Sequence, residues 1–402
     1  MRYIAIMGFG VIGSGVYDVI TTNQKILKKN IGEGVEIKYI LDLREFPNHP
    51  ANKLITHNID DIISDKDVEL VVETMGGVEP AFTFEERALK AGKHVVTSNK
   101  ELVEAKGAML FEIARKHSVN FFFEASVGGG IPIIRGINSC LTADKIEEVS
   151  GILNGTTNYI LTSMNREGVS YEDALKKAQE LGYAEKDPTA DVEGHDAGRK
   201  IAILASMVTG KNVSFDKMSC EGISKITKED FLYARKLGMS VKLIATAYFL
   251  DDDKVMALVA PRFVPSDNDL YAVEGVFNAV SVHGNMVDHV MFYGRGAGSH
   301  ATASAVVADI VEALKRNSET VYPGWSNEEA EVIGPTSAIG KYFIRVNDMQ
   351  KQEDALEILG GGKIVDAGVD GEYGIVTGLM DEETFAKKLS KIDGVIMNIR
   401  IK

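Results

Sequence analysis

The sequence predicts an α/β chain in three parts: a doubly wound parallel sheet, a larger α+β domain and a small α+β module at the C-terminus. Through residues 1–127, short apolar runs alternate with helical patterns, which is typical of a parallel sheet built from strand–helix–strand units. Beyond Gly128 the apolar runs are longer and several are separated only by short turns, which indicates antiparallel pairing. Residues 341–402 follow the order β-α-β-β-α-β of the ferredoxin-like arrangement.

The chain begins with a strand followed by a glycine-rich turn. The run 3–7 is continuously apolar, as expected of a strand buried on both faces, and a helical pattern starts soon after it. Glycines with the spacing G-x-G-x-x-G lie between the two, where they allow a tight turn and close approach of the backbone to a pyrophosphate. This predicts a Rossmann domain whose dinucleotide contacts Gly8, Phe9, Gly10, Val11, Ile12 and Gly13.

Polar residues follow several further strands of this first domain. We expect these strands at 36–41, 69–73, 93–97 and 119–123, and helices at 80–92 and 102–116. The carboxyl ends of parallel strands meet at one edge of the sheet, which is where such sheets bind their ligands. The side chains expected at that edge are those of Thr74, Ser98, Lys100 and Glu124.

The second part opens at a glycine-rich hinge and closes at a glycine-rich loop, 294–298. Between them we expect a helix from about Pro132 and strands at 146–153, 241–250, 255–264, 277–283 and 286–293. The small residues of a helix at 301–315 can pack closely on the first domain, which would place Gly298 beside the dinucleotide. We therefore divide the chain into a dinucleotide-binding domain (1–127 plus 299–320), a substrate-binding and dimerisation domain (128–298) and the C-terminal module (335–402).

Composition excludes several classes of partner. The 402 residues carry a formal net charge of -14, which argues against binding nucleic acid or anionic membranes. Two cysteines form no disulfide framework and fit a reducing cytosol. No apolar stretch approaches the roughly 18 residues of a membrane-spanning helix, and the N-terminus lacks the basic region of a signal peptide. We expect a cytoplasmic protein.

The most informative stretch is 181–200, which is crowded with charged residues just before an apolar helix. A solvated loop would explain such a composition. However, the helix buries the face that carries Ile201 and Leu204, and Asp196 and Lys200 lie four residues apart along the flank of that face. Partial burial lowers the pKa of an ammonium group and a nearby carboxylate raises it, and these opposed effects suit a proton-transferring lysine.

These features together resemble the homoserine dehydrogenase family. The resemblance covers roughly residues 1–320 and rests on GFGVIGSG (8–15), VTSNK (96–100), EASVGGGIPIIR (124–135), GILNGTTNYIL (151–161), LGYAEKDPTADVEGHDAGRK (181–200) and GRGAGSHATASAVVADI (294–310). It implies an enzyme that interconverts L-homoserine and L-aspartate 4-semialdehyde with NAD or NADP, in threonine and methionine biosynthesis. It also implies a homodimer or homotetramer.

The resemblance assigns roles to the charged side chains. Lys200 is implied as the acid/base group, with Asp196 orienting it, and Lys100 polarises the reacting oxygen or only caps a turn. Glu185 is implied as the acid that binds the substrate ammonium group. Asp191 supports that acid or is a plain loop aspartate. Asn154, Thr156 and Thr157 line the substrate side, although a polar turn of this kind can equally cap the next helix.

A monovalent cation, sodium, is the second implied ligand. Its ligands would be Glu124 and the backbone carbonyls of Val127, Gly129 and Ile131, because oxygen ligands suit a hard cation. The alternative is a glutamate that only pins the hinge between the domains.

The sequence departs from the family pattern at three places. Lys186 stands where the family more often has a small residue or proline. Near the ribose, Asp42 favours the free 2′-hydroxyl of NAD while Arg44 can accept the 2′-phosphate of NADP, and we expect both coenzymes to be accepted. The C-terminal module resembles a shortened ACT domain, but the turn at 347–350 lacks the usual Asp followed by Pro-Gly, so an assembly role is as well supported as amino-acid binding.

Two other functions share some of these sequence features. Aspartate-semialdehyde dehydrogenase chemistry needs a cysteine nucleophile beside a histidine. Cys140 falls in a helical stretch and Cys220 in a charged loop, and neither is placed for that role. A non-catalytic sensor of dinucleotide and amino acid is disfavoured by the intact set of Lys100, Glu185, Asp196 and Lys200.

Overall fold

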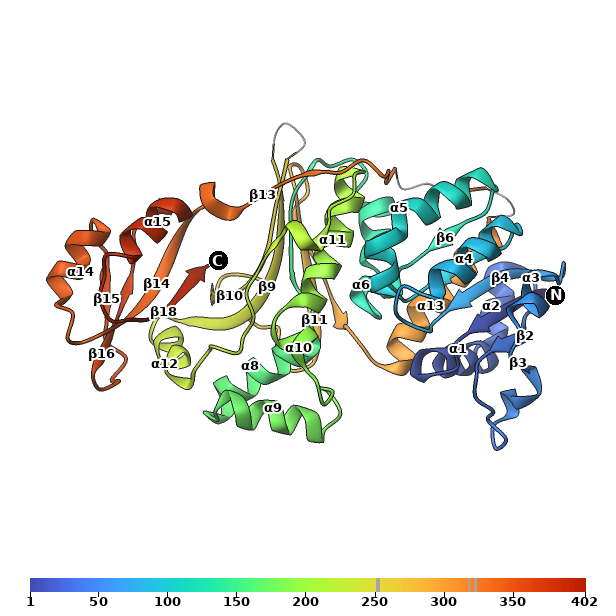
Figure 1. Cartoon of the computed structure of the whole chain (residues 1–402), viewed down its shortest axis with the longest axis horizontal. Helices are drawn as coiled ribbons and strands as arrows, with labels where there is room; N and C mark the ends of the chain where they lie inside the picture. The colour runs from blue at the N-terminus through green and yellow to red at the C-terminus, as the bar shows by residue number, and fades with distance from the viewer. Residues whose placement is uncertain (251–253, 317–318, 322–323) are drawn as a thin grey trace.

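The protein forms three lobes in a row, as Figure 1 shows for the computed structural model. The N-terminal lobe and the C-terminal lobe lie at opposite ends, with a large sheet between them. The structure describes residues 1–250, 254–316, 319–321 and 324–402. No helix in these ranges is long and apolar enough to cross a membrane.

The N-terminal lobe is built on a six-stranded parallel sheet, as predicted. Its strand order is β3-β2-β1-β4-β5-β6. Successive strands are added on one side of β1 up to β3 and on its other side from β4 onward, and sheets of this type bind their ligands at this switch point between β1 and β4. The short strand β3 was not predicted, and β6 is shorter than the strand predicted at 119–123. The strands are β1 (Arg2–Met7), β2 (Val35–Leu41), β3 (Ile55–Thr56), β4 (Val68–Glu73), β5 (His94–Thr97) and β6 (Phe121–Phe122).

Both faces of this sheet are buried. Ile4 and Ile6 of β1 belong to one apolar core and Ala5 and Met7 to another, as period-two alternation in a doubly covered strand requires. The covering helices are α1 (Val11–Thr22), α2 (Gln24–Ile31), α3 (Ile59–Ile63), α4 (Ala81–Lys90), α5 (Lys100–Lys116) and, from far along the chain, α13 (Ser299–Lys315).

Helix α13 returns to the N-terminal lobe and packs directly on α1. A Cβ atom at Gly15 would lie 2.6 Å from Ser299 Oγ, so only glycine permits this approach. Ala303, Val306 and Ile310 of α13 are buried in the same core as Ile4. The close packing expected from the small residues of this helix is therefore observed.

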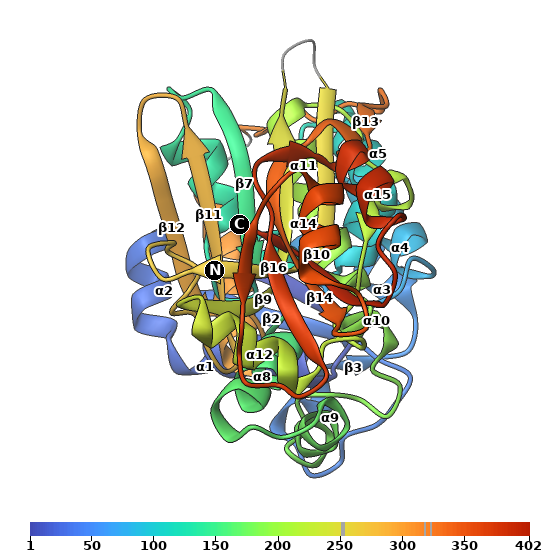
Figure 2. The ribbon, with the colours of Figure 1, turned by 90° about the vertical axis from the view of Figure 1, so that its left-hand side faces the viewer.

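The central lobe contains a mixed sheet whose long strands pair antiparallel, as predicted. Strands β12, β11, β7, β9 and β10 are neighbours in this order. Figure 2 shows them side by side, with the C-terminal lobe in front of β9 and β10. The strands are β7 (Ile146–Ile152), β8 (Ser219–Cys220), β9 (Met239–Phe249), β10 (Lys254–Pro265), β11 (Phe277–Gly284), β12 (Asp288–Arg295) and β13 (Glu331–Ile333).

Of the helices between β7 and β9, α11 lies between the central sheet and the N-terminal lobe, whereas α12 lies on the side of the C-terminal lobe (Figure 1). Helix α11 contacts both β9 and α5, so it forms the junction between the two lobes. These helices are α8 (Gly155–Glu167), α9 (Tyr171–Glu180), α10 (Thr189–Val192), α11 (His195–Thr209) and α12 (Lys228–Lys236).

The helix expected from Pro132 is broken into short pieces. These pieces are α7 (Ile133–Arg135) and a π-type turn, Gly136–Cys140, and a further short helix, α6 (Ala125–Gly128), precedes them. Gly136 lies under the ring of Phe292, and a Cβ atom there would lie 2.6 Å from that ring. Tertiary packing against β12 therefore overrides the local helical pattern.

The C-terminal lobe has the predicted order β-α-β-β-α-β, with a two-residue strand added. Its sheet order is β18-β14-β16-β15. An unpredicted feature is that β18 pairs parallel to β10, with Arg262 opposite Arg400, so this sheet continues the central one. The elements are β14 (Ile339–Asn347), α14 (Gln352–Leu359), β15 (Lys363–Val365), β16 (Glu372–Val376), β17 (Met380–Asp381), α15 (Glu382–Leu389) and β18 (Val395–Ile401).

Candidate active site

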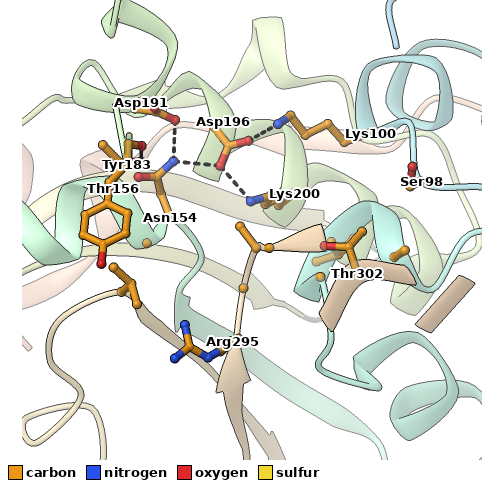
Figure 3. Close-up of a pocket in the computed structure, with 18 of the residues that line it drawn as sticks. Ser98, Lys100, Asn154, Thr156, Tyr183, Asp191, Asp196, Lys200, Arg295 and Thr302 are labelled. Atoms are coloured by element: carbon orange, nitrogen blue, oxygen red, sulfur yellow. Dashed lines mark hydrogen bonds and ion pairs between the residues drawn. The ribbon is translucent and has the colours of Figure 1, made fainter. Parts of the chain in front are cut away.

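A cavity of about 530 Å³ lies at the junction between the N-terminal and central lobes. It is lined from both lobes: Ile12 and Lys100 come from α1 and α5, and Lys200 from α11. Figure 3 shows its polar side chains converging from separate elements. Predicted site residues among its lining are Ile12, Ser98, Lys100, Val127, Gly129, Asn154, Thr156, Asp191, Asp196, Lys200 and Gly298.

One carboxylate pairs with two ammonium groups at this cavity. Lys200 Nζ lies 2.7 Å from Asp196 Oδ2, and Lys100 Nζ lies 2.5 Å from Asp196 Oδ1. Asp196 and Lys200 meet because they lie one turn apart on α11, as their spacing predicts. Lys100 is the first residue of α5, and the cap of that helix is Asn99, whose side chain accepts a hydrogen bond from Leu102 N. Lys100 is thus free to reach across to α11.

The protonation states of the triad formed by Lys100, Asp196 and Lys200 follow from burial and charge. Burial lowers the pKa of Lys200 below its ordinary value, and Asp196 opposes this shift. Burial would raise the pKa of Asp196, but the two ammonium groups outweigh it and hold that pKa well below its ordinary value. Burial also acts to lower the pKa of Lys100, but Asp196 outweighs it and the pKa is raised. Lys200 is therefore the more readily deprotonated of the two amines.

Asn154 connects the triad to α8 and to the loop before α11. Its Nδ2 donates to Asp191 Oδ1 at 2.7 Å and to Asp196 Oδ2 at 2.9 Å. Its Oδ1 accepts from Thr157 N at 2.8 Å, which caps α8. Asn154 therefore both lines the cavity and caps α8, so the two interpretations of this turn are compatible. Thr156 donates to Tyr183 O from the same turn.

The glycine-rich turn has the shape that a dinucleotide requires. A Cβ atom at Gly13 would lie 2.0 Å from Gly8 O, so glycine is required for the turn to fold back on itself. Thr74 Oγ1 donates to Gly8 O at 2.8 Å and ties the turn to the end of β4. The N-terminus of α1 leaves free N–H groups beside the turn. These residues fit a bound dinucleotide.

Asp42 and Arg44 form one unit at the end of β2. Asp42 Oδ2 accepts from Phe9 N at 2.7 Å, and the Arg44 guanidinium donates to both Asp42 oxygens. Arg44 holds the pKa of Asp42 well below its ordinary value, although burial opposes this. The arginine side chain is 61% exposed while that of Asp42 is 8% exposed, so an incoming group meets the cation first.

Glu185 is not brought to the triad. It is exposed on the loop after α9 and is not among the residues that line the cavity. The neighbouring residues Leu181, Gly182 and Tyr183 do line it. The loop therefore borders the cavity, but Glu185 itself is not part of the lining.

The carboxylate of Glu124 has partners within the segment that joins the two lobes. It accepts hydrogen bonds from Ile134 N at 2.7 Å and from Arg135 N at 3.0 Å, and it forms an ion pair with the Arg135 guanidinium. Ile131 O accepts from Ile133 N. These contacts correspond to the alternative reading, in which the glutamate pins the segment that joins the lobes. The sodium site itself stays a prediction.

Several residues that line the cavity were not predicted from the sequence, among them Tyr183, Arg295 and Thr302. Arg295, at the end of β12, lies across the cavity from Asn154, while Tyr183 and Thr302 contribute hydroxyl groups (Figure 3). Arg295 lies within the glycine-rich loop GRGAG (294–298). A single cationic residue in such a loop was the feature of the sequence that could have indicated a binding residue. The two cysteines are elsewhere: Cys140 is exposed, and burial raises the pKa of Cys220 to about 11.

A parallel sheet with a glycine-rich dinucleotide turn, joined to a cavity with two lysines, defines an NAD(P)-binding oxidoreductase. The family model "Homoserine dehydrogenase, NAD binding domain" matches residues 8–124, and the model "Homoserine dehydrogenase" matches residues 132–311. The homoserine dehydrogenase of Bacillus subtilis is 41% identical over 353 residues, which cover 86% of this chain and 81% of the relative. The chain belongs to the homoserine dehydrogenase family.

Solved structures agree with this assignment. A homoserine dehydrogenase from Thiobacillus denitrificans superposes with a TM-score of 0.90 at 33% identity, covering 100% of this chain and 98% of that chain. A hyperthermophilic archaeal homoserine dehydrogenase in complex with NADPH has a TM-score of 0.66 at 27% identity, covering 78% of this chain and 98% of that chain.

Proposed function

We propose that this chain catalyses the NAD(P)-dependent interconversion of L-homoserine and L-aspartate 4-semialdehyde. The single observation that carries the proposal is the pair of lysines sharing Asp196 in a cavity that reaches Ile12 at the start of α1. The bound coenzyme supplies the hydride chemistry, so the protein must orient the small molecule and move one proton.

Lys200 is suited to be the proton-transferring group. An ammonium group has three N–H donors, and two of them are used by Leu153 O at 2.8 Å and by Asp196 Oδ2. The third is left for the substrate oxygen. In aldehyde reduction, protonated Lys200 gives a proton to the carbonyl oxygen as hydride reaches the carbonyl carbon. In alcohol oxidation, neutral Lys200 takes the hydroxyl proton as the same carbon loses its hydride.

Lys100 would polarise the same oxygen. It holds one oxygen of Asp196 and keeps its other N–H donors, and its raised pKa keeps it charged at neutral pH. A fixed positive charge stabilises the partial negative charge that develops on oxygen in either direction. The two lysines thus divide the work between proton transfer and charge stabilisation.

The two ends of the amino-acid moiety require groups of opposite charge. Asp191 lines the cavity beside Asn154 and is a partially buried carboxylate available to the substrate ammonium group. Glu185 would join it only after the loop 181–188 moves inward. Arg295, exposed at the opposite wall, is the cation available to the substrate carboxylate.

We further propose that the chain works as a homodimer or homotetramer in the cytoplasm and that its C-terminal lobe is ACT-like with a structural role. Support for the structural role comes from the β10–β18 pairing and from Arg345, which is buried and forms ion pairs with Asp230 and Glu372. These contacts join the lobe to the central sheet and to α12.

A steady-state assay of the purified chain tests the proposed reaction. L-homoserine is supplied with NAD and with NADP in separate reactions, with and without threonine, and reduced coenzyme is measured. Reduction that depends on homoserine is expected with both coenzymes. Absence of turnover with homoserine, together with phosphate-dependent oxidation of the semialdehyde, would instead favour the cysteine-dependent dehydrogenase.

A further inference from the structure

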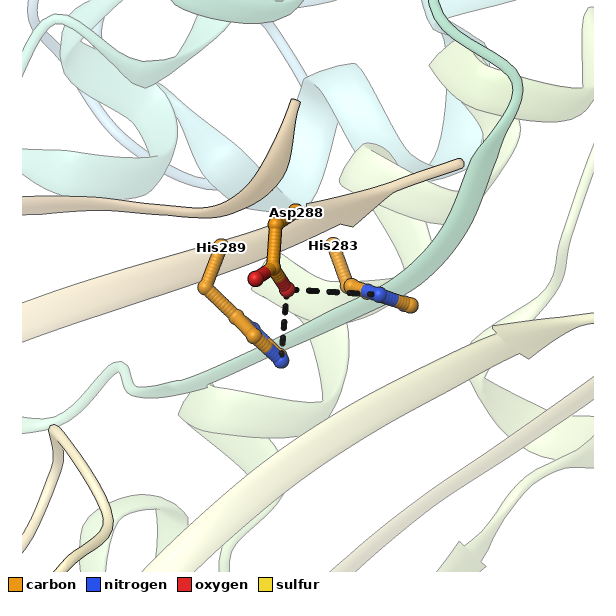
Figure 4. A group of neighbouring side chains, drawn as sticks. All are labelled: His283, Asp288 and His289. Atoms are coloured by element: carbon orange, nitrogen blue, oxygen red, sulfur yellow. Dashed lines mark ion pairs between the residues drawn. The ribbon is translucent and has the colours of Figure 1, made fainter. Parts of the chain in front are cut away.

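Two histidines and an aspartate gather at the tip of the β11–β12 hairpin, far along β12 from the cavity. We propose that this group, the hairpin cluster of His283, Asp288 and His289, binds one divalent transition-metal ion of the zinc type. Figure 4 shows the three side chains turned toward one another.

The antiparallel register places the two histidines together. His283 lies directly opposite His289 in the β11–β12 ladder, so both side chains project from the same face of the hairpin. Their rings stack with centroids 4.5 Å apart and an angle of 26° between the planes. Asp288 begins β12 with a positive φ of 61°, a conformation uncommon for an aspartate within a strand. Its carboxylate reaches both histidines.

The ligand atoms are close to coordination distances. One atom from each side chain lies within 4.8 Å of the other two, and Nε2 of each histidine lies 3.8 Å from Asp288 Oδ1. Zinc bonds of about 2.0–2.2 Å in tetrahedral geometry place ligand atoms roughly 3.4 Å apart. The two histidine–aspartate separations need to shorten by a few tenths of an ångström, and the two stacked rings must also turn toward a common point. The side chains are partly or largely exposed and able to make these movements.

A second carboxylate supports one of the histidines. His283 Nδ1 lies 3.5 Å from Glu147 Oε2, while its Nε2 faces Asp288. A carboxylate at one ring nitrogen favours the proton there and leaves the other nitrogen as a metal ligand. Glu147 is therefore a positioning residue, and the three ligands leave a fourth position for water.

The chemistry selects the class of ion. Two imidazoles and one carboxylate favour zinc, copper(II) or nickel over magnesium and calcium, which prefer oxygen ligands alone. The ion would bridge the two strands at the end of the hairpin whose other end carries Arg295 at the cavity. We expect it to stabilise the hairpin without taking part in the proposed reaction.

Isothermal titration of the full-length, chelator-treated protein with zinc chloride tests the proposal. The wild type should bind one zinc ion per chain that the His289→Gln variant binds at least 10-fold more weakly. The Glu147→Gln variant should lose about 10–100-fold, as is usual for a group that orients a metal ligand. The His117→Gln variant, which changes an exposed histidine outside the cluster, is the matched control and should titrate as the wild type does.

Thermal melting provides a second readout. Zinc should raise the melting temperature of the wild type and of His117→Gln but not that of His289→Gln. Homoserine turnover in chelator should be equal in wild type and His289→Gln, which keeps this test separate from that of the proposed reaction. Identical zinc isotherms for wild type and His289→Gln would overturn the proposal.

Discussion

Lys100 and Lys200 form ion pairs with different oxygens of the Asp196 carboxylate: Lys100 Nζ lies 2.5 Å from Oδ1, and Lys200 Nζ lies 2.7 Å from Oδ2. The aspartate is buried and yet holds its pKa well below the ordinary value, because the two ammonium groups stabilise its charge more than burial destabilises it. The same carboxylate opposes the effect of burial at both lysines: the pKa of Lys100 is raised, whereas burial still leaves the pKa of Lys200 below its ordinary value. The acid/base properties of the site therefore belong to the triad rather than to any one residue.

Replacing Lys200 with alanine should remove proton transfer. We expect kcat for homoserine oxidation to fall by about 10²–10⁴-fold, because a positioned acid/base group contributes on that order. Coenzyme affinity, measured by fluorescence titration, should change little. The Lys176→Ala variant changes an exposed lysine on α9 and should retain full turnover. Unaltered kcat in Lys200→Ala would remove this lysine from the mechanism.

The Asp196→Asn variant should shift the pH profile. Without the negative charge, the pKa of Lys200 falls further, because burial and the positive charge of Lys100 are then opposed by Asp191 alone among the charges that act on it. The pH at which neutral Lys200 becomes available as a base for oxidation therefore moves down. We expect the acidic limb of the kcat profile to move to lower pH, together with a loss in maximal rate. An acidic limb in the same place as in the wild type would contradict this coupling.

Arg44→Ala should separate the two coenzymes. The guanidinium is exposed at the end of β2 and is the group available to a 2′-phosphate, whereas the freed Asp42 would repel it. We expect KM for NADP to rise by at least about 10-fold and KM for NAD to change little, since a charge-assisted hydrogen bond contributes roughly 1.5–3 kcal/mol. Equal changes in both KM values would show that Arg44 does not distinguish the 2′-phosphate of NADP from the 2′-hydroxyl of NAD.

Substrate recognition can be divided between two residues. Arg295→Gln and Glu185→Gln should each raise KM for homoserine by at least about 10-fold while kcat falls less, because each removes a charged partner of the bound amino acid. Glu172→Gln on α9 serves as the exposed control. If Arg295→Gln raises KM but Glu185→Gln leaves it unchanged, then the carboxylate of Glu185 does not contact the substrate during turnover, which matches its absence from the cavity lining.

Glu85→Gln should change the pH dependence of stability. Glu85 is fully buried beside Glu73, and burial raises its pKa well above the ordinary value. The folded chain therefore keeps a proton that the unfolded chain releases above about pH 4.5, so the stability of the wild type falls as pH rises. In Glu85→Gln this loss is absent.

Urea unfolding at several pH values measures the difference. The free energy of unfolding of Glu85→Gln relative to wild type should increase by up to about 1.4 kcal/mol per pH unit above pH ~4.5. The exposed Glu36→Gln variant should show no such slope. A constant difference across pH would mean that Glu85 is already ionised in the folded protein.

Features of short sequence range were predictable. The turn from β1 to α1 depends on Gly8 and Gly13 within one segment, and the Asp196–Lys200 contact follows from one helical turn. Apolar periodicity likewise predicted the main strands of both sheets and the order of elements in the C-terminal lobe. In each case the determining interactions join residues that are close along the chain.

Contacts between distant segments were decided only by the tertiary structure. Lys100 meets Asp196 because α5 and α11 pack together, and Arg295 reaches the cavity because β12 leads back to the N-terminal lobe. The partners of Glu124 and the pairing of β10 with β18 are likewise long-range. Sequence patterns report which residues are buried, but not which of many apolar surfaces they meet. The sequence by itself therefore determined the elements and the dinucleotide turn, and packing decided which charges share the site.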